Sequence, residues 1–458
     1  MSLKAVLDQI DSNLPAATDR LLELLRIPSV STDPAFAPHC QTAADWLVAD
    51  LQSIGAEATK RDTPGHPMVV GHVAGEGPHI LFYGHYDVQP VDPLNLWDRD
   101  PFDPAIEDTP AGRVIRGRGS SDDKGQLMTF VEACRAWREV NGTLPCQITF
   151  FFEGEEESGS PSLIPFMTEN AEELTADIAL ICDTGLFESR VPAIITMLRG
   201  LAGIEVEITG PDRDLHSGMY GGLVRNPLHV MSSLIAGLHD ETGRITLEGF
   251  YDDVPELSDD IRAQWQALSF DHGTFLGDIG LTEQGGEVER TPLEKLWSRP
   301  TCEVNGLWGG YTGDGSKTVL PSKAHAKFTF RLVGQQDPAK IVAALKAYVE
   351  AHIPSDYKVA YKGDKGAPAA QMSVSHPAFE QARKALSDEW PDAAAYVGCG
   401  GSIPIAGFFK DILNMDAMLI GFGKDDDQIH SPNEKYDLES FHKGIRSWAR
   451  VLEEMTRK

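Results

Sequence analysis

Short apolar runs alternate with longer amphipathic segments through the first third of the chain. Residues 79–83, 147–152 and 177–182 are rich in β-branched and aromatic side chains, whereas residues 126–140 have helical periodicity. Continuously apolar strands are typical of a sheet that is covered on both faces. A further run at 416–420 is expected to rejoin that sheet. We therefore predict an α/β domain with a mostly parallel twisted sheet flanked by helices.

The pattern changes between residues 197 and 363. Alternating apolar and polar positions at 203–208 and 324–332 predict strands with one buried face, and helical stretches follow at 227–238 and 338–351. This order is typical of an α+β domain. We predict that it is inserted into the first domain, which would comprise residues 1–196 and 364–458.

Composition and charge exclude several classes of partner. The chain has 458 residues, with 40 Lys and Arg against 69 Asp and Glu, which gives a net charge of −29. Such a surface repels nucleic acid and anionic lipid, and no apolar run approaches the roughly 18 residues of a membrane span. The N-terminal pattern is that of an amphipathic helix and not of a signal peptide. We expect a cytoplasmic protein with no nucleic-acid or membrane partner.

The chemistry-bearing side chains are concentrated where the predicted strands end. The first strand is followed by His85, the long one by Glu157 and the next by Asp183, while His430 lies in the loop after the last. With Asp122, these residues form a set of imidazoles and carboxylates that suits zinc, manganese or cobalt. Two ions roughly 3.5–4 Å apart need about two ligands each and one shared bridge, which this set can supply.

Six motifs in order resemble those of a known family. They are Gly84-His85-Tyr86-Asp87, Gly117 to Gly125, Glu156-Glu157-Ser158-Gly159, Asp183, Asp214 to Gly218, and His430-Ser431-Pro432-Asn433-Glu434-Lys435. These residues closely resemble the motifs of the di-zinc aminoacylase, glutamate carboxypeptidase and carnosine dipeptidase family, and are most similar to the carnosine dipeptidase branch.

The resemblance implies a role for each motif residue. Asp122 would bridge two divalent metal ions, expected to be zinc, with His85 and Asp183 on one ion and Glu157 and His430 on the other. Only the register Glu156-Glu157-Ser158-Gly159 matches the pattern Glu-Glu-x-Gly, so Glu156 would be the general base. Asp87 would accept the second ring N–H of His85.

The same resemblance gives the inserted domain a function. It would be a lid and dimerisation domain, whose His216 steadies the oxyanion in the active site of the partner subunit. Arg331 would hold a substrate carboxylate through its two-pronged guanidinium group. Thr318 and Ser402 lie in matching segments and would also bind substrate.

These expectations define a homodimeric metal-dependent exopeptidase that cleaves dipeptides or similar small peptides with a free C-terminal carboxylate. Aspartate at position 183 favours peptides, because aminoacylases of the family tend to have glutamate there. Gly398-Cys399 departs from the Arg-Glu of the carnosine dipeptidase branch. An N-acyl-amino-acid amidohydrolase, such as a deacetylase or desuccinylase, is therefore the alternative. A non-catalytic metal-binding protein is the remote one.

Overall fold

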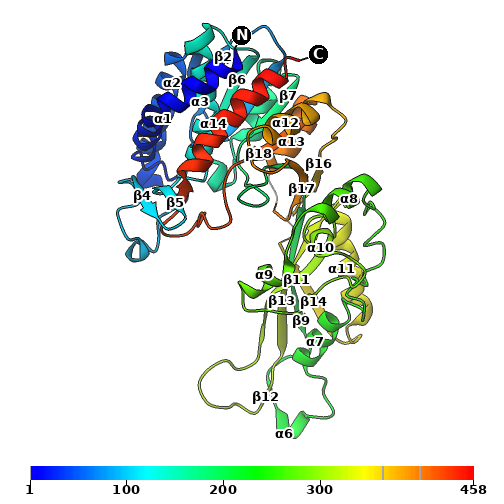
Figure 1. Ribbon diagram of the computed structural model, residues 1–458. Coiled ribbons are helices and arrows are strands. Elements are labelled where there is room, and N and C mark those ends of the chain that lie inside the picture. The colour runs from blue at the N-terminus through cyan, green and yellow to red at the C-terminus, as the bar shows by residue number, and fades with distance from the viewer. Residues whose placement is uncertain (1, 364–365, 402–403, 458) are drawn as a thin grey trace. The chain divides into compact units, whose positions relative to one another are not determined.

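The computed structural model describes residues 2–363, 366–401 and 404–457, which divide into two compact units (Figure 1). Unit 1 comprises residues 1–196, 372–397 and 408–458, and unit 2 comprises residues 197–371 and 398–407. In the part of the chain that is described, every helix is too short or too polar to cross a bilayer.

Unit 1 is built around a mixed sheet with the order β1-β2-β6-β3-β7-β18-β8, and β17 pairs with β8. The sheet strands and the helices around them are β1 (Glu57–Arg61), β2 (Met68–Val73), β3 (His79–His85), β6 (Gln147–Glu153), β7 (Ile178–Ile181), β8 (Ala193–Leu198), β17 (Ala395–Cys399), β18 (Ala417–Gly421), α1 (Leu3–Leu25), α2 (Ala37–Ser53), α3 (Lys124–Asn141), α4 (Leu163–Glu169), α5 (Ala171–Leu174), α12 (Pro377–Ser387), α13 (Pro404–Leu413) and α14 (Leu438–Glu454). A small antiparallel sheet adds β4 (Ala105–Thr109), β5 (Gly112–Arg116) and β19 (Lys435–Asp437), in the order β19-β5-β4.

The prediction of a mostly parallel sheet is wrong in its outer strands. Only the centre is parallel, where β6, β3, β7 and β18 lie side by side. The pairs β1–β2, β2–β6 and β18–β8 are antiparallel. The physical reason is the length of the connections: β1 leads to β2, and β7 to β8, through short loops without a helix, and a parallel crossover needs a longer connection.

The core of unit 1 lies between the central strands and the helices α3, α1 and α14, which pack on one another. Phe82 of β3 stacks on Phe130 of α3 with ring centroids 3.9 Å apart. Trp448 of α14 meets both rings edge-on. Packing of this kind fixes β3, and with it the strand end at His85.

Unit 2 has an antiparallel sheet in the order β11-β13-β9-β14, with β15 beside β9. Its elements are β9 (Gly200–Thr209), β10 (Leu215–His216), β11 (Thr301–Gly309), β12 (Val319–Leu320), β13 (Lys323–Leu332), β14 (Lys358–Lys362), β15 (Gly366–Ala367), β16 (Ala370–Gln371), α6 (Ser217–Tyr220), α7 (Pro227–Ala236), α8 (Asp259–Ala267), α9 (His272–Gly277), α10 (Pro292–Trp297) and α11 (Pro338–His352). Alternate residues of β9 and β13 are buried, and α7 and α11 pack on the sheet through them. The α+β pattern read from 203–208 and 324–332 follows from this one-sided burial.

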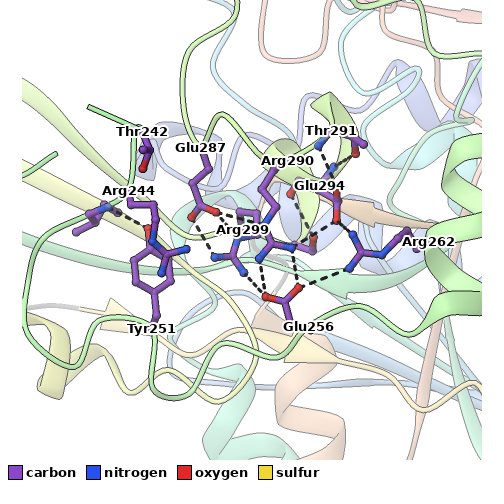
Figure 2. Close-up of polar contacts among 12 residues, drawn as sticks. Thr242, Arg244, Tyr251, Glu256, Arg262, Glu287, Arg290, Thr291, Glu294 and Arg299 are labelled. Atoms are coloured by element: carbon purple, nitrogen blue, oxygen red, sulfur yellow. Dashed lines mark hydrogen bonds and ion pairs between the residues drawn. The ribbon is translucent and has the colours of Figure 1, made fainter. Parts of the chain in front are cut away.

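A network of arginine and glutamate side chains joins α8, α10 and the segments that flank α10 (Figure 2). Arg299 holds Glu287 by two hydrogen bonds of 2.9 and 3.1 Å, and both side chains are buried. Arg290 forms a similar pair with Glu256, at 2.6 Å for each bond. Buried ions are tolerated when they are paired and hydrogen-bonded in this way. The network therefore holds residues 256–299 of unit 2 to one another.

Candidate metal centre

The predicted ligands meet at one edge of the unit 1 sheet because the parallel strands end there. His85 is the last residue of β3, and Asp183 lies two residues beyond β7. Glu157 lies in the 3₁₀ turn Glu156–Ser158 after β6, and His430 lies in the loop after β18. Ligands of open α/β sheets are bound beyond the carboxyl ends of such strands.

The five side chains form two sets that share Asp122. In the first, His85 Nε2 lies 3.1 Å from Asp122 Oδ1 and 3.9 Å from Asp183 Oδ2. In the second, His430 Nε2 lies 2.9 Å from Asp122 Oδ2 and 3.4 Å from Glu157 Oε2. Within each set, all the donor atoms lie within 4.8 Å of one another. The two oxygens of Asp122 therefore face different histidines, as a bridging carboxylate requires. The Asp122–Asp123 peptide bond is cis.

Asp87 contacts both His85 and the turn that carries Glu156 and Glu157. His85 Nδ1 lies 3.1 Å from the main-chain oxygen of Asp87, and 3.4 Å from its carboxylate. The two carboxylate oxygens accept hydrogen bonds from the main-chain N–H groups of Glu156 and Glu157, at 3.2 and 3.1 Å. One fully buried side chain thus fixes the turn that carries both glutamates.

Burial and neighbouring charges shift the pKa of several groups at the site. Burial raises the pKa of Asp183 well above its ordinary value, and the Asp122 carboxylate raises it further. Burial also raises the pKa of Glu156, and the carboxylate of Glu157 adds to this rise. Hydrogen bonds to Asp122 and Glu157 raise the pKa of His430 to about 10. The site therefore retains protons that a bound cation would displace.

The residues fit a divalent metal ion in two further respects. The donors are imidazole nitrogens and carboxylate oxygens without a thiolate, which suits zinc, manganese or cobalt. Glu157 Oε1 is buried and has no hydrogen-bond partner among the described residues, while Oε2 accepts a bond of 2.7 Å from Gln89. A buried carboxylate oxygen without a donor is costly, and a cation would compensate for this cost.

Three residues that the sequence predicts to bind substrate, His216, Thr318 and Arg331, belong to unit 2. His216 is exposed at the end of β10, and its Nδ1 accepts a bond of 3.0 Å from the Gly218 N–H. It lies next to Thr318, whose main-chain oxygen accepts a bond of 3.0 Å from Ser217 N. Arg331 is half-buried on β13, opposite Leu201 of β9. Ser402 lies outside the described residues.

Two supporting carboxylates carried no role in the sequence prediction. The hydroxyl of Tyr83 donates to Glu153, and burial raises the pKa of Glu153 to about 8. Glu434 accepts hydrogen bonds from the loop that carries Asp122. Glu434 belongs to the motif that begins at His430. An acidic residue immediately before β19 was therefore the signal in the sequence that could have identified it.

We place the protein among the metal-dependent hydrolases, because a carboxylate with a raised pKa stands beside two sets of metal donors. Residues 81–454 match the profile of Peptidase family M20/M25/M40. The chain is 30% identical to the Cys-Gly metallodipeptidase dug1 of Schizosaccharomyces pombe, over 99% of this chain and 98% of the relative.

Solved structures agree with this match. Human carnosine dipeptidase 1 superposes with a TM-score of 0.79 and 26% identity, covering 100% of this chain and 99% of that one. The metallo-carboxypeptidase Sso-CP2 of Sulfolobus solfataricus superposes with a TM-score of 0.78 and 30% identity, covering 96% of this chain and 99% of that one. The chain belongs to Peptidase family M20/M25/M40 and is a metallopeptidase, which confirms the family resemblance of its motifs.

Proposed function

We propose that the protein is a two-metal exopeptidase that hydrolyses dipeptides and similar small peptides with a free C-terminal carboxylate. The observation that carries this proposal is the pair of donor sets that share Asp122. His85 and Asp183 would hold one ion, and Glu157 and His430 the other. Zinc is the expected metal, and manganese and cobalt suit the same donors. The bound ions would lower the pKa of a water molecule and polarise the scissile carbonyl.

Glu156 is the proton carrier of this reaction. It lies directly before the ligand Glu157, where a carboxylate can take a proton from water and then give it to the leaving amine, and burial raises its pKa. Asp87 holds the main-chain N–H groups of Glu156 and Glu157, so base and ligand keep a fixed spacing. The chain thereby supplies a base that is positioned before substrate binds.

Unit 2 is proposed to act as a lid and dimerisation domain. The exposed ring of His216 suits contact with a second chain, where the partner subunit's His216 would donate to the oxyanion. Arg331 would hold the substrate carboxylate, and Thr318 and Ser402 would contribute further polar contacts. A homodimer is the assembly that this arrangement requires.

The relatives support small peptides as substrates. Among them are a Cys-Gly metallodipeptidase and a carnosine dipeptidase, both matched over nearly the whole chain. An N-acyl-amino-acid amidohydrolase would use the same centre on a substrate that has no free α-amino group.

Substrate profiling on metal-reconstituted protein tests the proposal. Unblocked dipeptides should be hydrolysed in preference to N-acetyl and N-succinyl amino acids, and Glu156→Gln should abolish turnover while metal remains bound. Turnover of the acylated set alone would establish the amidohydrolase instead. Full turnover by Glu156→Gln would refute the assignment of the base, and a chain that binds metal without any turnover would be a binding protein.

A further inference from the structure

Glu434 is a fully buried glutamate in the loop that carries His430, and each of its carboxylate oxygens accepts two hydrogen bonds. Oε1 accepts from the main-chain N–H groups of Ser121 and Asp122, at 2.9 and 3.1 Å. Oε2 accepts from the Gly119 N–H at 2.9 Å and from Arg118 Nη1 at 2.8 Å. Four hydrogen bonds from residues 118–122 of one loop are thereby directed at a single side chain.

This loop presents the shared ligand. It connects β5 to α3 and includes Asp122, whose oxygens face His85 and His430. The hydrogen bond that Glu434 accepts from the Asp122 N–H fixes the main chain from which the Asp122 carboxylate projects. Because Glu434 is only four residues beyond His430, it also ties the histidine loop to the aspartate loop. The two are far apart in sequence.

A second contact between the same loops strengthens the connection. Asp427 is fully buried and accepts a hydrogen bond of 2.7 Å from the Ser121 hydroxyl. Its other oxygen accepts from Lys435 Nζ at 2.8 Å. Lys435 itself starts β19, which pairs with β5 opposite Arg116. Asp427 and Lys435 thus fix the chain on either side of Glu434, so Glu434 has little freedom to follow a displaced ligand.

We infer that Glu434 is a positioning residue of the metal centre, which holds Asp122 in the orientation that lets one carboxylate serve both donor sets. The inference rests on the proposed function. A carboxylate is needed because the donors approach both oxygens, and it carries no hydrogen of its own. Glutamine would direct its NH₂ group at two of the donors, whichever way the amide faces, and would leave them unsatisfied.

Metal affinity tests this inference without relying on activity. We expect Glu434→Gln to raise the dissociation constant of at least one Zn²⁺ ion about 10- to 100-fold in a chelator competition, because supporting groups of metal ligands have effects of this size. The Co²⁺-loaded variant should show a changed visible spectrum. Near-saturating metal should restore part of the kcat of the variant. Its KM for a dipeptide should stay within about twofold of wild type, because Glu434 does not contact substrate.

Glu132→Gln is the matched control. Glu132 is also a buried carboxylate, lies in the middle of α3, and accepts hydrogen bonds from Arg20 of α1 and Arg135 of α3. It should lose stability with unchanged Zn²⁺ affinity. Equal loss of affinity in both variants, or affinity within twofold of wild type in Glu434→Gln, would overturn the inference. If Glu434→Gln does not fold, Glu434→Asp keeps the charge but shortens its reach, and the same two outcomes decide. A wild-type chain that binds none of Zn²⁺, Mn²⁺ and Co²⁺ would instead refute the proposed function.

Discussion

Replacing Asp87 by asparagine tests how the turn of Glu156 and Glu157 is held. Asp87 is fully buried, and both of its oxygens accept main-chain N–H groups, at 3.2 and 3.1 Å. Asparagine has the same shape but one oxygen, so at least one of these donors loses its acceptor. A buried donor without a partner costs about 1–3 kcal/mol. If that cost falls on the transition state, kcat decreases about 5- to 150-fold.

The assay is steady-state hydrolysis of an unblocked dipeptide, combined with metal analysis. Metal content should stay at the wild-type level, because His85 Nδ1 retains the main-chain oxygen of Asp87 at 3.1 Å. Asp177→Asn makes the same change at the other end of β3, where Asp177 accepts a bond of 2.8 Å from His79 N. That control should keep kcat within twofold. If Asp87→Asn is folded and its kcat is less than threefold lower than that of wild type, the reasoning is refuted.

Three further predictions concern other groups. Mixing inactive His216→Ala and Glu156→Gln chains in equal amounts should restore about a quarter of wild-type activity, because half of the dimers are hybrids with one complete site; no recovery would show that His216 does not act across subunits. The raised pKa of Glu153, about 8, means that the folded state keeps a proton that the unfolded chain loses, so the free energy of unfolding falls as pH rises from about 4.5 to about 8. Denaturant unfolding should show that Glu153→Gln gains stability relative to wild type between pH 5 and pH 8, by roughly a few kcal/mol, and a constant difference would contradict the assignment. Arg331→Met should lower kcat/KM for unblocked dipeptides about 10- to 100-fold and leave C-terminally amidated peptides unaffected; equal losses on both would exclude carboxylate recognition.

The sequence was informative where chemistry follows a strand end. His85, Asp183 and His430 come directly after apolar runs or in the loop that follows them, and the parallel centre of the sheet brings those ends together. The orientation of the outer strands could not be predicted in the same way. It depends on which strand pairs with which, and local apolar pattern does not encode that pairing.

The contacts that support the site were even harder to predict from the sequence. The hydrogen bonds of Asp87 to the glutamate turn, and of Glu434 to the aspartate loop, join residues that are distant in the chain. Their side-chain types suited several partners equally well. Only the folded arrangement shows that Asp87 contacts the main-chain N–H groups of Glu156 and Glu157 as well as the ring of His85. Sequence motifs therefore indicated which residues matter more reliably than what each one contacts.

The position of β18 has a consequence for the growing chain. This strand lies between β7 and β8 in the sheet, yet residues 199–416 are synthesised after β8 and before β18. At ordinary rates of translation this takes roughly 10–40 s, during which β7 and β8 have no partner between them and expose strand edges that favour aggregation. His430 and Glu434 emerge from the ribosome later still. The second set of donors, which includes His430, therefore cannot assemble until residue 430 has been synthesised.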